Sequence, residues 1–283
     1  MYAECALKNT VLMVNDKRLT NANLLNETQQ MIPQSLIEKL QSTQHLVILT
    51  GAGVSAESGI ATFRDALTGL WRNYDAQSLA SEFGFLADPA LVWGWYEWRR
   101  IRVLRAQPNP AHHTIAQLEK QVTKLTLITQ NVDDLHERAG SCEVLHLHGS
   151  LHQPRCLLCE QPYIFPKETL PENDKENRIK PPRCHLCDGP VRPGVVWFGE
   201  QLPDHAWQLA QEACRHCDLM LVVGTSGVVW PVAQLPYLTD KKRCSIVQIN
   251  PLKTSLNAVA AFNLHGKAGE ILPQLYAAAF SKD

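Results

Sequence analysis

Residues 46–56 have the sequence LVILTGAGVSA. The four apolar residues Leu46 to Leu49 indicate a buried strand. After them, Gly51-Ala52-Gly53-Val54-Ser55-Ala56 fits G-x-G-x-x-A, the alanine-ending variant of the dinucleotide-binding loop. In such a loop Gly51 allows the tight turn, and Gly53 lets the backbone approach a pyrophosphate at the N-terminus of the next helix. The loop alone is a weak signal, because glycine also serves ordinary strand-to-helix turns, and its place after a strand strengthens it.

Three more apolar runs have the same form, at Leu125–Ile128, Leu219–Val223 and Ile246–Ile249. Each is followed by small or polar residues, namely Thr129-Gln130-Asn131, Gly224-Thr225-Ser226 and Asn250. Strands apolar on both faces, separated by helical stretches such as 111–122 and 206–214, predict an α/β fold with a parallel sheet covered by helices on both sides. Ligands bind such sheets at the carboxyl ends of strands, so we expect these polar endings to line one crevice.

The composition sets limits on partners and location. The chain has 283 residues, with 27 Lys plus Arg against 28 Asp plus Glu, so it offers no broad basic field for nucleic acid or anionic membranes. No apolar stretch approaches the roughly 18 residues that cross a bilayer. The start of the chain lacks the features of a secretory signal, and we expect a cytoplasmic location.

We expect three parts in the chain. Residues 1–31 are rich in Asn and Thr and show no sustained period, which favours a poorly ordered extension. Residues 32–149 and 200–283 would form the large dinucleotide-binding domain. Residues 150–199, rich in Pro, Cys and charge, would form a small module.

Two C-x-x-C pairs, Cys156-Leu157-Leu158-Cys159 and Cys184-His185-Leu186-Cys187, predict a zinc site in that module. Because Cys156, Cys159, Cys184 and Cys187 would fill all four positions, the zinc would be structural and activate no water. A third pair, Cys214-Arg215-His216-Cys217, leads directly into the run at Leu219. Small apolar cysteines pack well there, so core packing is the favoured interpretation of that pair.

A histidine stands at a predicted strand end. In residues 143–149, EVLHLHG, alternation places His146 and His148 on one face. A histidine beside a crevice can act as a general base near neutral pH. The residues alone favour a structural histidine and do not choose between the two.

Polar residues follow the predicted strand at 125–128. Amides of Gln130 and Asn131 could bind a carboxamide, and carboxylates of Asp133 and Asp134 a ribose hydroxyl. Capping of the next helix by either aspartate is an equally good interpretation.

Taken together, several motifs resemble the signatures of the sirtuin family, and in particular the bacterial NAD-dependent protein deacylases. They are Gly51-Ala52-Gly53-Val54-Ser55 running to Gly59-Ile60-Ala61-Thr62-Phe63-Arg64, then Thr129-Gln130-Asn131-Val132-Asp133, then His148-Gly149. The resemblance extends from about Ile32 to Leu275 and includes the four zinc cysteines.

The resemblance implies a Rossmann-like domain, a zinc-binding small domain, and a cleft between them where NAD and acyl-lysine meet. NAD would be consumed as a co-substrate. The acyl oxygen would attack the ribose carbon that bears nicotinamide, and His148 would then help to deprotonate a ribose hydroxyl that attacks the imidate. The products would be free lysine, nicotinamide and O-acyl-ADP-ribose, and His146 would have no assigned role.

The resemblance also implies the ligand contacts. Asn131 and Asp133 would hold the carboxamide, Phe63 would shield the ribose, and Arg64 would meet phosphate. The implied NAD pocket also includes Gly51, Ala52, Gly53, Ser55, Ala56, Thr62, Trp71, Gln130, Gly224, Thr225, Ser226, Asn250 and Ala268. The segment Val195-Val196-Trp197-Phe198-Gly199 resembles the one that pairs with substrate backbone, although it could simply be an apolar strand. The loop 62–71 departs from the glycine-rich form of many family members.

A last resemblance concerns the acyl group. Tyr96 and Arg99 are three residues apart and share one face of a predicted helix over 90–104. Locally, a solvated basic face formed with Arg100, Arg102 and Arg105, with Tyr96 packed on Trp93, is the simpler interpretation. However, Tyr-x-x-Arg resembles the acyl-pocket motif of class III sirtuins, and Ala76 resembles the small residue that leaves room for a longer chain. This implies removal of succinyl and malonyl as well as acetyl groups.

Two other functions compete with this one. An NAD-dependent dehydrogenase would use the same loop but transfer a hydride, and a non-catalytic zinc-ribbon protein would present its cysteine pairs to nucleic acid. The sequence has no basic, aromatic-interleaved patch for the second. The expected partners are acyl-lysine proteins of unspecified identity, with no nucleic acid or membrane, and the oligomeric state stays open, a monomer included.

Overall fold

The computed structural model describes residues 32–61, 74–75, 79–166 and 178–281. These residues belong to one compact unit, Ile32–Asp283. The predicted N-terminal extension, residues 1–31, lies outside the described residues.

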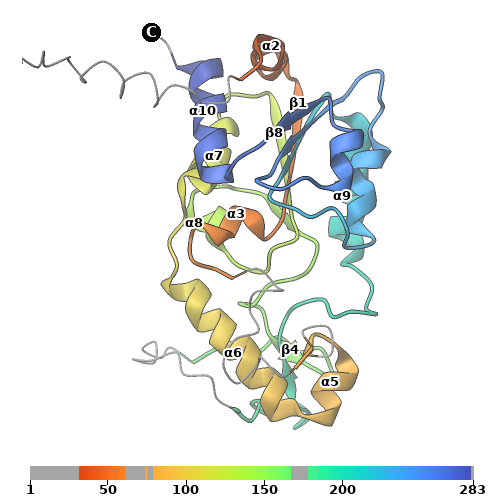
Figure 1. The fold of residues 1–283 in the computed structure, drawn as a ribbon. Helices are drawn as coiled ribbons and strands as arrows, with labels where there is room; N and C mark the ends of the chain where they lie inside the picture. Colours follow the sequence, from red (N-terminus) through yellow and green to blue (C-terminus); the bar gives the residue numbers. More distant parts are fainter. Residues whose placement is uncertain (1–31, 62–73, 76–78, 167–177, 282–283) are drawn as a thin grey trace, which may run out of the picture. The chain divides into compact units, whose positions relative to one another are not determined.

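A six-stranded parallel sheet forms the centre of this unit, in the order β3-β2-β1-β6-β7-β8 (Figure 1). The strands are β1 His45–Thr50, β2 Lys124–Thr129, β3 Val144–His146, β6 Leu219–Val223, β7 Ser245–Ile249 and β8 Phe262–Leu264. The predicted parallel sheet is therefore confirmed. The chain runs outward in opposite directions from β1 and β6, so the strand order switches between these two strands, where such sheets bind ligands.

Helices cover both faces of the sheet. Alternate residues of β1 point to opposite faces, so Leu46 and Ile48 enter one apolar cluster and Val47 and Leu49 another. The first cluster includes α2 Gln34–Ser42, α3 Gly53–Ala56, α7 Pro110–Leu118 and α10 Ala268–Phe280. The second includes α9 Asp204–His216 and the 3-10 helix η2 Val232–Leu238.

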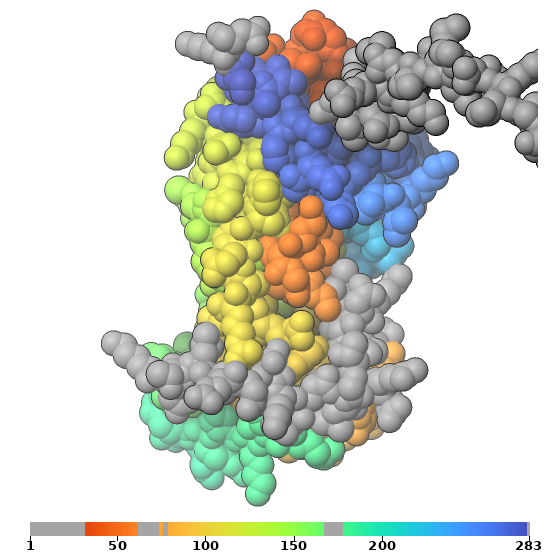
Figure 2. Space-filling view, turned by 60° about the vertical axis from the view of Figure 1, so that its left-hand side comes forward, coloured from red at the N-terminus to blue at the C-terminus, as the bar shows by residue number. Residues whose placement is uncertain are grey.

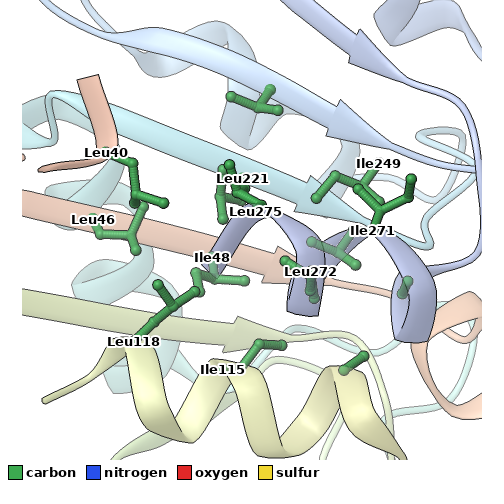
Figure 3. Packing of buried hydrophobic residues seen from close by; sticks show 14 of the residues in the cluster. Leu40, Leu46, Ile48, Ile115, Leu118, Leu221, Ile249, Ile271, Leu272 and Leu275 are labelled. Atoms are coloured by element: carbon green, nitrogen blue, oxygen red, sulfur yellow. The ribbon is translucent and has the colours of Figure 1, made fainter. Parts of the chain in front are cut away.

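The core between β1, α7 and α10 is closely packed. Figure 3 shows Ile115 and Leu118 of α7 and Leu272 of α10 directed toward Ile48 of β1. Burial of each such leucine or isoleucine contributes about 1.5–3 kcal/mol. From outside, α7 (yellow) and α10 (blue) lie side by side on this face (Figure 2).

A third apolar cluster lies apart from the sheet. It joins α5 Glu82–Ala87 and α6 Pro89–Arg105 to the small two-stranded sheet of β4 Arg155–Cys156 and β5 Val191–Arg192. Asp88 caps α6, because its Oδ1 accepts a hydrogen bond from Leu91 N at 3.1 Å. The small sheet therefore buries apolar area against the two helices. The division into residues 32–149 with 200–283, and 150–199, stays a prediction.

The remaining elements are short: α8 Leu135–Arg138 and the 3-10 helix η3 Ser255–Ala258. Within the described ranges, no helix is both long and apolar enough to cross a membrane.

Candidate active site and metal centre

The loops that follow β1 and β6 touch each other through glycines. Gly53 N donates to Gly224 O at 2.8 Å, and Gly51 N donates to Val223 O at 3.0 Å. A Cβ at Gly53 would lie 2.7 Å from Gly224 O, and one at Gly51 would lie 2.8 Å from Thr225 Cβ. Gly224 itself has a φ of 62°, which glycine adopts most readily. The glycines of the predicted dinucleotide loop are thus needed for contact between the β1 and β6 loops, whether or not a ligand is bound.

A cavity of about 1020 Å³ opens where these loops meet the carboxyl ends of β2 and β7. Its size suits a ligand as large as a dinucleotide. All the predicted cofactor and substrate residues that the structure describes line it: Gly51, Ala52, Gly53, Ser55, Ala56, Tyr96, Arg99, Gln130, Asn131, Asp133, His148, Val195 to Gly199, Gly224, Thr225, Ser226, Asn250 and Ala268. The predicted residues Thr62, Phe63, Arg64, Trp71 and Ala76 lie outside the described residues.

Amide side chains connect the strand ends that line the cavity. Asn131 Nδ2 donates to Ser55 Oγ at 3.1 Å, which joins the β2 loop to α3. Gln130 Nε2 donates to Thr225 Oγ1 at 2.9 Å, and Asn250 Nδ2 donates to Thr225 O at 2.9 Å. Because these bonds join loops after β1, β2, β6 and β7, they fix the positions of the polar groups that face the cavity.

Asp133 stabilises the start of a helix and also lines the cavity. Its Oδ1 accepts a hydrogen bond from Leu135 N at 3.2 Å, which stabilises the start of α8. The side chain also lines the cavity and is 5% exposed. Burial raises the pKa of Asp133, and its hydrogen bonds with Leu135 and Ser55 oppose that shift. A buried carboxylate of this kind is suited to accept hydrogen bonds from a ligand.

The two histidines at the end of β3 differ in their surroundings. His148 Nδ1 lies 3.0 Å from Gln130 O, and because a carbonyl can only accept, Nδ1 donates and Nε2 keeps its lone pair. Burial lowers the pKa of His148 despite this hydrogen bond, so its imidazole is neutral at pH 7. His148 lines the cavity. A neutral imidazole with an available Nε2 at this position can accept a proton.

His146 is held on both ring nitrogens. Nδ1 lies 3.2 Å from Asn131 O and Nε2 lies 2.6 Å from Glu137 Oε1. Burial alone would lower the pKa of His146, but the hydrogen bond and charge of Glu137 outweigh it and raise the pKa. These contacts suit a structural histidine. The hydrogen-bond partners therefore distinguish His148 from His146, which the alternation of residues along the sequence could not do.

Tyr96 and Arg99 reach the same cavity from α6. Tyr96 is 4% exposed and packs edge-on against Trp95, with ring centroids 4.7 Å apart. Burial raises the pKa of Tyr96 to about 12, so its hydroxyl stays a donor. The guanidinium carbon of Arg99 lies 5.0 Å from the Trp95 ring centroid, and burial lowers the pKa of Arg99.

The other arginines of α6 are placed differently. Arg100 pairs with Glu97 at 2.8 Å, while Arg102 and Arg105 are exposed. Tyr96 and Arg99 are therefore not part of a uniformly solvated basic face. The guanidinium carbon of Arg99 also lies 5.9 Å from the Tyr96 ring centroid. A partly desolvated guanidinium that lines a cavity together with a tyrosine is suited to bind a carboxylate.

The four predicted zinc ligands come together. The sulfurs of Cys156, Cys159, Cys184 and Cys187 all lie within 4.8 Å of one another. A tetrahedral zinc ion with four thiolates places its sulfurs about 3.8 Å apart, so the cluster fits one zinc. Leu158 N donates to Cys156 Sγ at 3.3 Å, and Leu186 N donates to Cys184 Sγ at 3.4 Å. With four protein ligands the metal has a structural role.

The third cysteine pair belongs to the core, as predicted. Cys214 and Cys217 are both 0% exposed and pack in the cluster under α9. Cys217 Sγ lies 3.4 Å from the sulfur of Cys244, a residue that sequence reasoning did not single out. Across the described ranges, the four zinc cysteines are the one group of His, Cys, Asp or Glu gathered as metal ligands.

Sequence reasoning missed several residues of the cavity rim. Val228, Val229 and Trp230 follow the β6 loop, and Leu252 and Lys253 follow β7. Trp230 is 69% exposed, which is unusual for so large an apolar side chain. In the sequence, the one feature that could have identified these residues is their position just after the predicted strands.

Comparison with known proteins agrees with this geometry. Residues 51–231 match the model of the Sir2 family. The NAD-dependent protein deacylase of Methylococcus capsulatus is 59% identical over 240 residues, which cover 85% of this chain and 94% of that protein. NAD-dependent protein deacylase 1 of Pseudomonas aeruginosa is 54% identical, with 87% of this chain and 99% of that protein covered.

Solved structures give the same result. A Sir2 homolog in complex with NAD has a TM-score of 0.79 and 44% identity, covering 87% of this chain and 93% of that one. Sir2 bound to acetylated peptide has a TM-score of 0.75 and 31% identity, covering 87% and 98%. The motifs, the parallel sheet, the cysteine cluster and these similarities lead to one conclusion: the chain belongs to the Sir2 family, the sirtuins.

Proposed function

We propose that this protein removes acyl groups from lysine side chains of other proteins and consumes NAD in doing so. The observation that supports this most is the position of His148. Its Nε2 keeps a lone pair, and the residue lines the same cavity as Asn131, Asp133 and the segment Val195–Gly199. A proton acceptor, polar groups that can bind a nucleotide and a backbone segment that can pair with a peptide therefore line the same cavity.

Each of these groups has a part in the reaction. Asn131 and Asp133 bind the nicotinamide carboxamide with an amide and a carboxylate. The backbone of Val195–Gly199 pairs with the substrate peptide as an added strand, which brings the acyl-lysine into the cavity. His148 takes a proton from a ribose hydroxyl at Nε2. One water is consumed when the lysine amine leaves and the acyl group moves to ADP-ribose, so the products are free lysine, nicotinamide and O-acyl-ADP-ribose.

The metal has no part in the chemistry. Zinc at Cys156, Cys159, Cys184 and Cys187 would stabilise the loops around β4 and β5, since four thiolates leave it no open position. The neighbouring strand β5 leads through Pro193 and Gly194 into the segment that pairs with substrate.

The acyl pocket favours acyl groups with a terminal carboxylate. Arg99 and Tyr96 supply a cation and a hydroxyl donor inside the cavity, and neither is needed by acetyl. We infer that succinyl and malonyl groups are removed at least as efficiently as acetyl. Action in the cytoplasm on acyl-lysine proteins, without nucleic acid or membrane as partner, is part of this proposal.

One experiment tests the proposal. Acetyl, malonyl and succinyl versions of one peptide are incubated separately with the protein, with and without NAD. The masses of the peptides are then measured by mass spectrometry. We expect loss of each acyl mass that depends on NAD, with succinyl and malonyl at least as fast as acetyl. Loss of acyl groups without NAD, or no loss with it, would refute the deacylase function.

A further inference from the structure

An ion pair between the buried Arg192 and the partly exposed Glu200 supports the cavity wall at Val195–Gly199. Arg192 is 5% exposed, and both of its terminal nitrogens donate to the Glu200 carboxylate, Nη2 at 3.0 Å. Nη2 also donates to Val195 O at 3.0 Å, and Nε donates to Pro193 O at 3.3 Å. Arg192 therefore fixes the backbone where the segment begins.

Glu200 fixes the same segment at its middle residue, Trp197. Its Oε2 accepts a hydrogen bond from Trp197 N at 2.8 Å, and Glu200 N donates to Trp197 O at 3.0 Å. Burial would raise the pKa of Glu200, but its hydrogen bonds with Arg192 and Trp197 outweigh this and lower it. The carboxylate is therefore charged at neutral pH and holds both partners.

The pair also holds the Trp197 side chain. The guanidinium carbon of Arg192 lies 3.5 Å from the Trp197 ring centroid, close enough for a strong cation–π contact. Trp197 is 1% exposed, lines the cavity, and packs on Phe85 with ring centroids 5.4 Å apart. One wall of the acyl pocket thus depends on Arg192.

The ion pair further connects the cavity to the metal centre. Arg192 lies on β5, where it pairs with Arg155 of β4, and the next residue of β4 is the zinc ligand Cys156. The positions of the four cysteines therefore influence the backbone at Val195, because the paired strands β4 and β5 connect the two.

We propose that the Arg192–Glu200 ion pair is a positioning device for substrate, which holds the backbone of Val195–Gly199 ready to pair with the peptide and holds Trp197 in the wall of the acyl pocket. This rests on the proposed deacylase function. A buried ion pair contributes little net stability compared with apolar packing, whereas a rigid backbone edge reduces the entropy lost when a peptide binds. The pair therefore acts on substrate binding more than on folding.

The test compares the effect of each variant on KM for the peptide with its effect on KM for NAD. Glu200→Gln removes the charge with little change in volume, and it should raise KM for an acetyl-lysine peptide at least about tenfold while KM for NAD changes little. Arg192→Lys keeps the charge but loses the two-bond geometry, so its KM should lie between those of wild type and Glu200→Gln. The matched control is Arg178→Met, which breaks the half-exposed ion pair of Arg178 with Asp88.

Control measurements separate positioning from folding. Zinc content and melting temperature are recorded for each variant, and Arg178→Met should leave both KM values as in wild type. If Glu200→Gln lowers the melting temperature but leaves the peptide KM unchanged, or raises both KM values equally, the ion pair is only structural and the inference is overturned.

A direct binding measurement separates this inference from the proposed function. A fluorescein-labelled acetyl-lysine peptide is titrated with each variant and followed by fluorescence anisotropy. If wild type binds the peptide without deacylating it, the proposed function fails, and weaker binding by Glu200→Gln still supports positioning. Equal affinity of wild type and Glu200→Gln overturns the inference, and no binding by wild type overturns both.

Discussion

Replacement of Arg99 by methionine tests the acyl pocket. The change removes the guanidinium that lies 5.0 Å from the Trp95 ring centroid and keeps an apolar side chain of similar length. Burial lowers the pKa of Arg99, which means that its charge is incompletely solvated. A carboxylate brought into the cavity would add a charged hydrogen-bond acceptor for this guanidinium. Succinyl and malonyl carry such a group, and acetyl does not.

The size of the effect follows from the hydrogen bond that is lost. Two unit charges 4 Å apart interact by about 4 kcal/mol at an effective dielectric of 20, and removing the carboxylate from water costs part of that. A hydrogen bond to a charged group contributes about 1.5–3 kcal/mol net. At about 1.4 kcal/mol for each factor of ten, Arg99→Met should lower kcat/KM for desuccinylation by roughly 10-fold to 150-fold.

The assay compares kcat/KM on acetyl and succinyl versions of one peptide. Loss of the contact with Trp95 costs about 0.5–1 kcal/mol of packing, but it affects both peptides, so the ratio of the two rates isolates the carboxylate. Arg105→Met, at the exposed end of the same helix and outside the cavity lining, is the control and should change neither rate. Equal losses on both peptides with Arg99→Met would refute the assignment of the pocket.

Three further predictions concern the base and the metal. His148→Ala should lower the rate of deacylation at least about 100-fold, as expected for loss of a general base. His146→Ala should lower the rate far less, because both ring nitrogens of His146 contact protein groups. Near wild-type turnover by His148→Ala would contradict this assignment. Because burial lowers the pKa of His148 and the base must be neutral, kcat/KM should persist as pH falls to 6.5 and decline only at lower pH; a midpoint above 6.5 would be inconsistent with the assignment. Cys159→Ala should lose zinc and the folded small sheet, and Cys214→Ser should keep full zinc by metal analysis; zinc loss in the latter would reverse the ligand assignment.

Buried strands were predictable because they are apolar on both faces. Leu46 to Leu49 and Leu219 to Val223 need no partner to be recognised, and both became central strands. The edge strand β8 Phe262–Leu264 was not predicted, since three residues are too few to show a period. The long helix predicted over 90–104 is confirmed as α6, Pro89–Arg105.

The site was predictable as far as motifs reach. The four cysteines have a spacing that metal chemistry requires, so their assembly followed from sequence. The choice of His148 over His146 needed partners distant in the chain, Gln130 O and Glu137, which only the fold brings close. The same holds for Arg192, whose contact with the Trp197 ring has no local signal. Substrate proteins could not be predicted from the sequence, because the proposed main-chain pairing would leave little side-chain selectivity.

In the proposed reaction, NAD is consumed because its ADP-ribose part accepts the acyl group. The most direct measurement quantifies, in one reaction with a succinyl-lysine or acetyl-lysine peptide, the free-lysine peptide, nicotinamide and O-acyl-ADP-ribose by mass spectrometry, with absorbance of reduced nicotinamide followed in parallel. We expect the three products to form in equal amounts and no reduced cofactor to appear. Formation of reduced cofactor without nicotinamide release, as in a dehydrogenase, or of free lysine together with a free carboxylic acid and intact NAD, would contradict it.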